Sequence, residues 1–304
     1  MINGVRSRYI LELIFSIIDE NYKLYIIKYN NNLKNILELD LAYYKNFSGR
    51  YKIGEKNGRA KEYSLNSKIL LFEGEYINGR RNGEGKEYYI NSKLKFFGKY
   101  KNGKRIGRGR EYDDLGGLKF EGEFENNKRN GKGKAFFYNG KIKFDGEYLN
   151  GLKNGNGKSF DINGKLIFGG KYLNDKKNGK GTEYYDFGNI KFDGEFLNDK
   201  RWNGFGYDPS GNIIYELKLG KGIIKEYYNS GILKFEGEYI NGEINGIVKE
   251  YFINGNLQYN GEYLKGKRNG KGKEYNYEKK LIYEGEYLEG EKKPKEFDEG
   301  CINQ

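Results

Sequence analysis

Pairs of basic residues recur along the chain just after an Asn-Gly or related turn, and clusters of this kind are suited to binding anions. The pairs are Arg80-Arg81, Lys104-Arg105, Lys128-Arg129, Lys176-Lys177, Lys200-Arg201 and Lys267-Arg268, and Lys153 is one half of a further pair. If hairpins stack in order, these pairs align as a basic ridge along one edge of a ribbon. The ridge predicts an anionic partner, either a phospholipid surface or an acidic protein, with nucleic acid less favoured.

A second interpretation of the same column needs no partner. Lys-rich hairpin turns are ordinary solvated surface, and they discourage edge-to-edge aggregation of sheets. Acidic residues near each turn also weaken the local positive field, and they are Glu75, Glu123, Glu147, Glu195 and Glu238. Both interpretations predict exposed basic side chains, and they differ only in whether a partner uses them.

Residues for enzyme chemistry are scarce. The chain has no histidine and one cysteine, Cys301, so it can form no Cys/His zinc site, no histidine-based triad and no disulfide within one chain. Residues 155–159, Gly-Asn-Gly-Lys-Ser, resemble a phosphate-binding loop, but that loop needs glycine where Leu152 stands. We therefore expect a protein that is not an enzyme, with no cofactor and no metal site.

The elements that position the basic pairs follow from a repeat. Repeats begin at Phe72, Phe96, Phe120, Phe144, Phe168, Phe192, Phe235, Tyr259 and Tyr283, mostly 24 residues apart. Each opens with aromatic-x-Gly-x-aromatic, and this period of two is the pattern of a β-strand. The rings and the glycine share one face of the strand, while Glu or Lys occupies the other. A fixed period of this length indicates one supersecondary unit used repeatedly.

A second strand follows a turn in each repeat. When the repeats are aligned, each position forms a column. The eighth column holds only Gly, Asn or Asp, which tolerate a positive φ, and Asn usually precedes it, as in Asn78-Gly79. This combination is a hairpin signal. The second strand of the Phe72 repeat contains Gly83 and Gly85, which leave part of one face bare. We expect the rings of the first strand to lie over these bare positions.

A return turn joins one repeat to the next at a further glycine column, which is Gly116, Gly140, Gly164, Gly188, Gly231 and Gly255. The expected fold is therefore mainly β, an elongated single-layer antiparallel ribbon of about ten tandem β-hairpins. The composition agrees, because 36% of the 304 residues are hydrophobic and 16% are aromatic. Such a chain has many rings but too few aliphatic side chains for a thick core.

The fifth column of the repeat predicts a partner-binding face. Its rings lie on the same face as the glycines, and they are Tyr76, Tyr100, Phe124, Tyr148, Tyr172, Phe196, Tyr239 and Tyr263. An aromatic face of this length is suited to bind a segment of another protein or a second copy of the chain. The favoured function is therefore a non-catalytic scaffold.

These columns resemble the membrane occupation and recognition nexus repeat, the MORN repeat. The likeness covers residues 47 to about 290 and rests on the Tyr/Phe-x-Gly-x-Tyr/Phe opening, the central Gly-x-Gly and the length of the repeat. The resemblance implies an extended, twisted single-sheet ribbon with a groove. It also implies scaffolding, partner binding and sometimes attachment to lipid.

Residues 1–46 precede the repeats and differ from them. Their apolar spacing predicts a short α-helical cap on the first strand. The order Ile-Leu-x-x-Ile-Phe-x-x-Ile that begins at Ile10 is similar to the F-box family, although the Leu-Pro that opens that motif is missing. This likeness implies an alternative role as a ubiquitin-ligase adaptor.

Two later stretches also depart from the repeat. Residues 201–222 contain the one tryptophan, Trp202, and they are interpreted either as a drifted repeat or as a bend or recognition spot. Residues 291–304 lose the pattern and form a C-terminal tail, so the ribbon spans residues 47–290.

The formal net charge of +12 supports the second alternative function, peripheral binding to an anionic membrane through the basic ridge. The apolar run from Ile10 to Ile18 is too short to span a bilayer and contains Glu12, so no transmembrane segment is expected. No cleavage site of small residues follows it, which disfavours a signal peptide. The expected location is the cytoplasm, including its membrane or cytoskeletal periphery.

Overall fold

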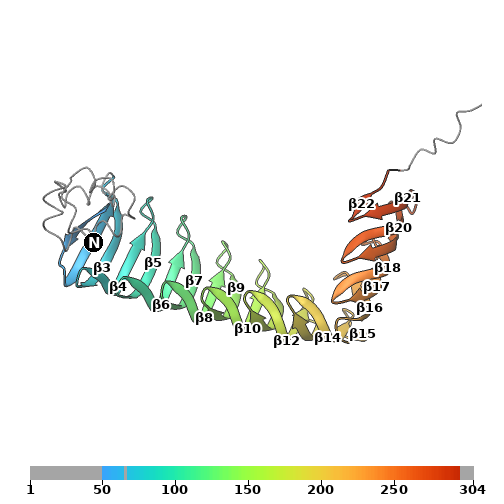
Figure 1. Cartoon of the computed structure of the whole chain (residues 1–304), viewed down its shortest axis with the longest axis horizontal. Helices are drawn as coiled ribbons and strands as arrows, with labels where there is room; N and C mark the ends of the chain where they lie inside the picture. Colours follow the sequence, from blue (N-terminus) through green and yellow to red (C-terminus); the bar gives the residue numbers. More distant parts are fainter. Residues whose placement is uncertain (1–49, 65–66, 295–304) are drawn as a thin grey trace, which may run out of the picture. The chain divides into compact units, whose positions relative to one another are not determined.

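The computed structural model describes residues 50–64 and 67–294, and within them every regular element is a β-strand. The chain divides into two compact units, the first ending at Gly117 and the second beginning at Leu118. Strands follow one another in chain order within each unit (Figure 1). Residues 1–46 lie outside the described residues, so the helical cap and the F-box-like segment remain predictions.

The first unit is an antiparallel succession of three hairpins. Its strands are β1 (Arg50–Gly54), β2 (Gly58–Ser64), β3 (Leu70–Ile77), β4 (Arg80–Tyr88), β5 (Leu94–Lys101) and β6 (Lys104–Tyr112). Each pairs with the next, so the predicted hairpin and return turn alternate along the unit.

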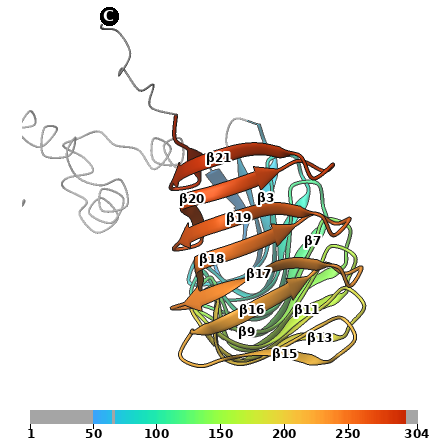
Figure 2. The ribbon, with the colours of Figure 1, turned by 90° about the vertical axis from the view of Figure 1, so that its right-hand side faces the viewer.

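The second unit continues the same arrangement in two sheets. The strands of the first sheet are β7 (Leu118–Glu125), β8 (Lys128–Phe136), β9 (Ile142–Leu149), β10 (Leu152–Phe160), β11 (Leu166–Leu173), β12 (Lys176–Tyr184), β13 (Ile190–Leu197), β14 (Lys200–Tyr207) and β15 (Ile213–Leu217). Those of the second are β16 (Gly222–Tyr227), β17 (Leu233–Ile240), β18 (Glu243–Tyr251), β19 (Leu257–Leu264), β20 (Lys267–Tyr275), β21 (Leu281–Leu288) and β22 (Glu291–Lys292). Figure 2 shows β16 to β21 side by side.

Two consecutive residues with positive φ close each hairpin from β3–β4 onward. Asn78 and Gly79 have φ angles of 51° and 76°, and Asn174 and Asp175 have φ angles of 50° and 70°. Left-handed conformation at both central residues is typical of the type I′ turn that suits the twist of a hairpin. The predicted turn column is confirmed, and the residue before it is left-handed as well.

Consecutive hairpin tips are joined through the backbone of the turn. The amide of Asp175 donates to the carbonyl of Lys153 at 3.0 Å, and the amide of Gly103 donates to the carbonyl of Arg81 at 2.8 Å. Because Lys153 and Arg81 belong to the preceding hairpins, each turn is tied to the one before it. The basic column is therefore held in register from repeat to repeat within a unit.

Rings packed on glycine form the core of both units. A Cβ on Gly181 would lie 2.5 Å from Cζ of Phe168, and one on Gly109 would lie 2.5 Å from Cζ of Phe96. Both rings are completely buried. A side chain on either glycine would therefore displace the ring, and this confirms the predicted packing of rings over the second Gly of the strand.

The first Gly of the second strand has a different role. Gly83 has a φ of 70° and lies in a β-bulge, where the pairing of β3 and β4 shifts between Gly74 and Tyr76. The side chain of Glu75, rather than a ring, covers Gly83. The acidic column of the sequence is therefore placed over the bulges of the hairpins.

Neighbouring rings contact one another edge to face. Phe144 lies 5.3 Å from Tyr148 and 5.2 Å from Tyr172, with interplanar angles of 84° and 89°. Aromatic pairs in this geometry contribute about 0.5–1.5 kcal/mol beyond the area that they bury. We call the face that carries these rings the ring face, and the other the opposite face. The ring face serves as a core, although no second layer covers it within the described residues.

The irregular stretch predicted at residues 201–222 contains a break between sheets. Between β15 and β16, the strand pairing is reduced to one isolated bridge from Lys218 to Lys221. Past the predicted end of the ribbon at residue 290, β22 still pairs with β21 through Leu288 and Glu291. The repeat pattern therefore continues slightly farther than the sequence indicated, but it is interrupted once within the second unit.

Replacing Gly181 with alanine tests the ring packing. Gly181→Ala should destabilise the protein by about 1–3 kcal/mol, because the new methyl group overlaps the buried Phe168 ring. The matched control is Gly169→Ala, since a Cβ there meets only Lys158 Cγ, at 3.9 Å. Urea unfolding of both variants measures the difference. Equal stability of the two variants would contradict the packing.

Candidate functional site

The fifth-column rings are part of the core. Seven of the eight residues predicted to bind a partner are at most 8% exposed, and Tyr239 is partly exposed; the seven are Tyr76, Tyr100, Phe124, Tyr148, Tyr172, Phe196 and Tyr263. These rings lie on one face in each unit, as the alternation of a strand requires. A partner on the ring face would therefore contact the charged side chains above the rings more than the rings themselves.

A ladder of ion pairs covers the rings of the first unit. The Arg81 guanidinium lies 4.0 Å from the centre of the Phe72 ring and pairs with Glu62 at 2.6 Å and with Glu87 at 2.7 Å. Arg105 continues the ladder to Glu87 and, at 3.0 Å, to Glu111. Burial opposes ionisation of Glu62, but Arg81 outweighs it, so the pKa of Glu62 is lowered. Cation–π contact and charge pairing therefore act on the same guanidinium.

The second unit contains two segments of the same ladder. In the first, Arg201 pairs with Glu183 and with Glu226, both at 2.7 Å, and Lys177 pairs with Glu183 at 2.5 Å. Because Glu183 belongs to β12 and Glu226 to β16, Arg201 joins the two sheets where the backbone pairing is interrupted. It also donates to the Tyr215 hydroxyl at 2.8 Å.

The other segment lies on β18 to β22. Arg268 pairs with Glu250 at 2.6 Å and with Glu274 at 3.8 Å, and Lys292 pairs with Glu274 at 2.7 Å. The Arg268 guanidinium lies 4.1 Å from the centre of the Tyr259 ring. The arrangement therefore repeats that of the first unit.

The two members of each basic pair lie in different environments. The first members are exposed, except that Lys200 is partly exposed, and they are Arg80, Lys104, Lys128, Lys176, Lys200 and Lys267. The second members are partly buried above the rings, and they are Arg81, Arg105, Arg129, Lys177, Arg201 and Arg268. Adjacent strand residues point to opposite faces, which separates the members of each pair. The sequence contained a signal for this separation. A Glu in the second strand, such as Glu87, recurs with the same period as the basic pairs.

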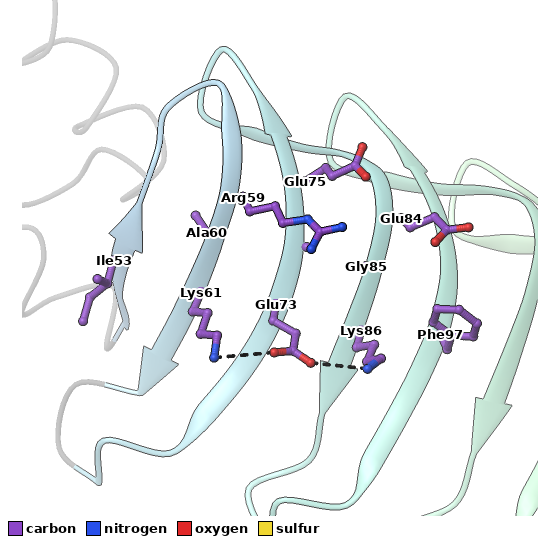
Figure 3. A pocket seen from close by; sticks show the side chains of 11 residues that line it. Ile53, Arg59, Ala60, Lys61, Glu73, Glu75, Glu84, Gly85, Lys86 and Phe97 are labelled. Atoms are coloured by element: carbon purple, nitrogen blue, oxygen red, sulfur yellow. Dashed lines mark ion pairs between the residues drawn. The ribbon is translucent and has the colours of Figure 1, made fainter.

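The opposite face also carries ion pairs, but they are more exposed. Glu73 lies 3.8 Å from Lys61 and 3.5 Å from Lys86 (Figure 3). These residues line a hollow of about 560 Å³ in the first unit, where Gly74 and Gly85 also lie. In the second unit, Glu236 contacts lysines of both neighbouring strands in the same way. Exposed pairs of this kind contribute little to stability.

Apolar side chains interrupt this charged surface in the second unit. Phe205, Ile223 and Ile247 lie on β14, β16 and β18, and they are 41%, 67% and 68% exposed. Their strand neighbours Gly206, Ile224 and Val248 point to the ring face, so these three point to the opposite face. The repeat pattern did not single them out, because they occupy a column that is polar elsewhere.

Trp202 lies at the junction between the two sheets. Gly220 donates its amide to the carbonyl of Trp202 at 2.7 Å, and a Cβ on Gly220 would meet the indole ring at 2.8 Å. Lys200 pairs with Glu243 at 2.8 Å on the far side of the junction. The irregular stretch therefore has a structural role in connecting the sheets.

The described part of the chain contains no group of three or more His, Cys, Asp and Glu residues arranged to hold a metal ion. None of its elements is a helix that could cross a lipid bilayer.

Comparison with known proteins finds a family match in six parts of the chain. A family model described as MORN repeat matches residues 72–93, 120–142, 144–165, 170–188, 235–257 and 259–276. No curated protein matches the chain.

Two solved structures of TarM match parts of the chain. One is a mutant of the S. aureus protein in complex with fondaparinux, α-GlcNAc-glycerol and UDP, with 14% identity, coverage of 48% of this chain and 24% of that chain, and a TM-score of 0.19. The other is a crystal structure of TarM, with 12% identity, coverage of 54% and 28%, and a TM-score of 0.20. The matches span only about a quarter of each TarM chain, and TM-scores this low support no conclusion about fold or function.

The Arg201 cluster predicts a loss of stability in acid. Burial opposes ionisation of Glu183, but Arg201 and Lys177 outweigh it and lower the pKa of Glu183 to about 2. The ionised carboxylate therefore stabilises the fold above about pH 4.5, by on the order of 3 kcal/mol, and this contribution is lost as the pH falls toward 2. Glu183→Gln should unfold more easily at pH 7 and should lose less stability between pH 5 and 2.

Chemical denaturation at a series of pH values measures both effects. The control is Glu289→Gln, because Glu289 lies in a hairpin turn and its side chain is 79% exposed. This variant should follow the wild type at every pH. If Glu183→Gln has the same pH dependence as the wild type, Glu183 does not couple acid to unfolding.

Proposed function

We propose that this chain, which contains MORN repeats, is a non-catalytic scaffold that binds a protein partner through its opposite face. The observation that supports this function best is the run of exposed apolar side chains at Phe205, Ile223 and Ile247. Soluble surfaces rarely expose several apolar side chains together unless they contact a partner.

The apolar run departs from the rule of its column. In other repeats the same position, between the two glycines of the second strand, is Glu84, Arg108, Lys132, Asn156, Lys180 and Lys271. Three consecutive second strands, β14, β16 and β18, replace this polar residue with Phe or Ile. Within the second sheet, Ile223 and Ile247 are two strands apart, which is about 9.6 Å. A change confined to consecutive strands favours a local contact surface over random drift.

Carboxylates border the apolar residues and indicate the chemistry of the partner. In the strand pairing, Ile223 is opposite Glu238, Ile247 is opposite Glu262, and Phe205 is opposite Glu216. A partner segment with apolar side chains in the middle and basic side chains at its rim would complement this surface. The predicted ring face is less suited to the same segment, because its rings are buried.

A second candidate function is peripheral binding to an anionic membrane through the hairpin tips. At several tips an exposed Leu is paired directly with a basic residue: Leu173 with Lys176, Leu197 with Lys200 and Leu264 with Lys267. The three leucines are 46%, 40% and 48% exposed. Apolar and basic side chains side by side are the combination that inserts at a negatively charged lipid surface.

Replacing the exposed apolar residues with lysine, which other repeats have at this position, tests the scaffold function. Ile223→Lys combined with Ile247→Lys should abolish capture of the partner by the immobilised full chain, because it places charges in the apolar surface. The matched control replaces two exposed apolar residues of the return turns, Tyr138→Lys with Ile253→Lys, and should capture as the wild type does. Binding of the purified captured protein is then measured by calorimetry, and light scattering reports whether the partner is a second copy. A wild-type chain that stays monomeric and captures nothing would contradict the proposal.

Co-sedimentation with vesicles tests the membrane alternative. The wild type should sediment with vesicles of phosphatidylserine and phosphatidylcholine and be released as salt rises. Lys176→Glu with Lys267→Glu should reduce binding, whereas Lys158→Glu with Lys180→Glu, which makes the same charge change on the exposed opposite face, should reduce it less. Equal binding to neutral vesicles, or equal loss in both variants, would exclude binding through the tips.

A further inference from the structure

At two consecutive hairpins of the second unit, the ion-pair ladder of the ring face lacks its carboxylate. In the strand pairing, Glu87 stands opposite Phe72 and Glu183 stands opposite Phe168. The same position is Ala135 opposite Phe120 and Ser159 opposite Phe144. Two consecutive hairpins therefore keep the rings and lose the acid. Gly206 stands opposite Phe192 in a third hairpin, but there Arg201 pairs with Glu183 and Glu226.

The cation between these two positions is retained. Lys153 is partly buried, with Nζ 4.7 Å from the centre of the Phe144 ring and 5.4 Å from that of Tyr172. No carboxylate of the described residues forms an ion pair with its ammonium. The Asp175 carboxylate instead accepts a hydrogen bond from the backbone amide of Lys153 at 2.8 Å. Lys153 therefore differs from Lys177, which pairs with Glu183 in the next hairpin.

Both repeats also keep the tyrosine whose hydroxyl donates to the carboxylate in another repeat. At the corresponding position in another repeat, Glu250 accepts hydrogen bonds from the Tyr263 hydroxyl and from Arg268. Tyr148 is opposite Gly131 and Tyr172 is opposite Gly155, the same register that Tyr263 has with Gly246. The Ser159 hydroxyl lies 2.7 Å from that of Tyr172. Burial raises the pKa of Tyr148 to about 12, so its hydroxyl stays protonated and able to donate. The donors that hold a carboxylate in other repeats are thus present where the carboxylate is missing.

The electrostatic state of Lys153 agrees with a missing partner. Burial lowers the pKa of Lys153, because part of its hydration is lost without an ion pair to replace it. A carboxylate bound beside Lys153 would reverse this effect and strengthen binding at the same time.

We propose that carboxylates of an acidic segment of another protein bind at the positions left by Ala135 and Ser159, on either side of Lys153. The two positions are one repeat apart, about 9.6 Å, so acidic side chains of one segment can reach both. Carboxylate is favoured over phosphate because the ladder itself uses carboxylates at this position. This site lies on the ring face and is separate from the apolar surface of the proposed function, so it does not depend on that function.

Filling the gaps with the residue of the other repeats tests the site. The probe is a fluorescein-labelled peptide of eight glutamates, measured by fluorescence anisotropy with the full chain at low salt. Ala135→Glu combined with Ser159→Glu should weaken binding by at least about tenfold, because the new carboxylates occupy the positions and pair with Lys153. Thermal unfolding of this variant should occur at the same temperature as the wild type or higher.

A matched control separates the site from general electrostatics. Asn156→Glu with Asn260→Glu makes the same change in net charge on the opposite face, where other repeats already have Glu84 and Glu284 in these columns. This control should bind the peptide as the wild type does. Equal weakening in both double variants overturns the proposal.

A second pair of variants tests the site independently of whether the Ala135→Glu, Ser159→Glu double variant folds. Lys153→Met keeps the packing above Phe144 but removes the charge, and it should also weaken binding. Lys158→Met, on the opposite face of the same strand, should not. Wild-type peptide binding that Lys153→Met leaves intact would overturn the proposal.

Other probes distinguish the source of the anion. An eight-glutamine peptide should not bind, and inorganic phosphate should not displace the glutamate peptide at equal concentration. The proposal is overturned if the wild type fails to bind the glutamate peptide, or binds phosphatidylserine vesicles through Lys153 instead. Because Ile223→Lys with Ile247→Lys should bind the peptide normally, failure of this site and failure of the proposed function give different results.

Discussion

An aromatic ring can lie flat on a strand only where the facing residue has no side chain. Phe168 over Gly181 and Phe96 over Gly109 show this constraint, since a methyl group on either glycine would overlap the ring. The contact lets a single layer bury large apolar side chains, which ordinarily requires a second layer of structure. The period of the repeat follows, because each hairpin must supply both a ring and the bare position that receives the ring.

The rings also determine where the charges lie. A guanidinium such as that of Arg81 packs above a ring and is partly withdrawn from water, so it requires carboxylates on both sides. The resulting ladder is a structural use of residues that look like ligands for an external anion. The ladder also connects the two sheets where backbone pairing is interrupted, since Arg201 forms ion pairs with Glu183 of β12 and Glu226 of β16.

Departures from the repeat are therefore more informative about function than the repeat itself. A regular column is explained by packing, whereas Phe205, Ile223 and Ile247 are exposed and contribute nothing evident to it. Ala135 and Ser159 are the reverse case, in which a stabilising residue is absent and its partner Lys153 remains. The apolar run and the incomplete ladder lie on opposite faces of the second unit, which is consistent with a scaffold that contacts more than one segment.

The sequence by itself determined the hairpin repeat, the turn positions and the packing of rings on glycine. Each of these features requires particular residue types that recur with the period of the repeat, such as Gly85, Asn78-Gly79 and Phe72. It did not determine which side chains a partner can reach. Arg80 and Arg81 are the same residue type and adjacent in the sequence. The pairing of strands and the bulge at Gly83 decide that Arg80 is exposed and that Arg81 lies between Glu62 and Glu87. The break between β15 and β16 was likewise decided by tertiary structure, since it depends on whether neighbouring strands meet in register, and contacts between residues far apart in the chain settle that.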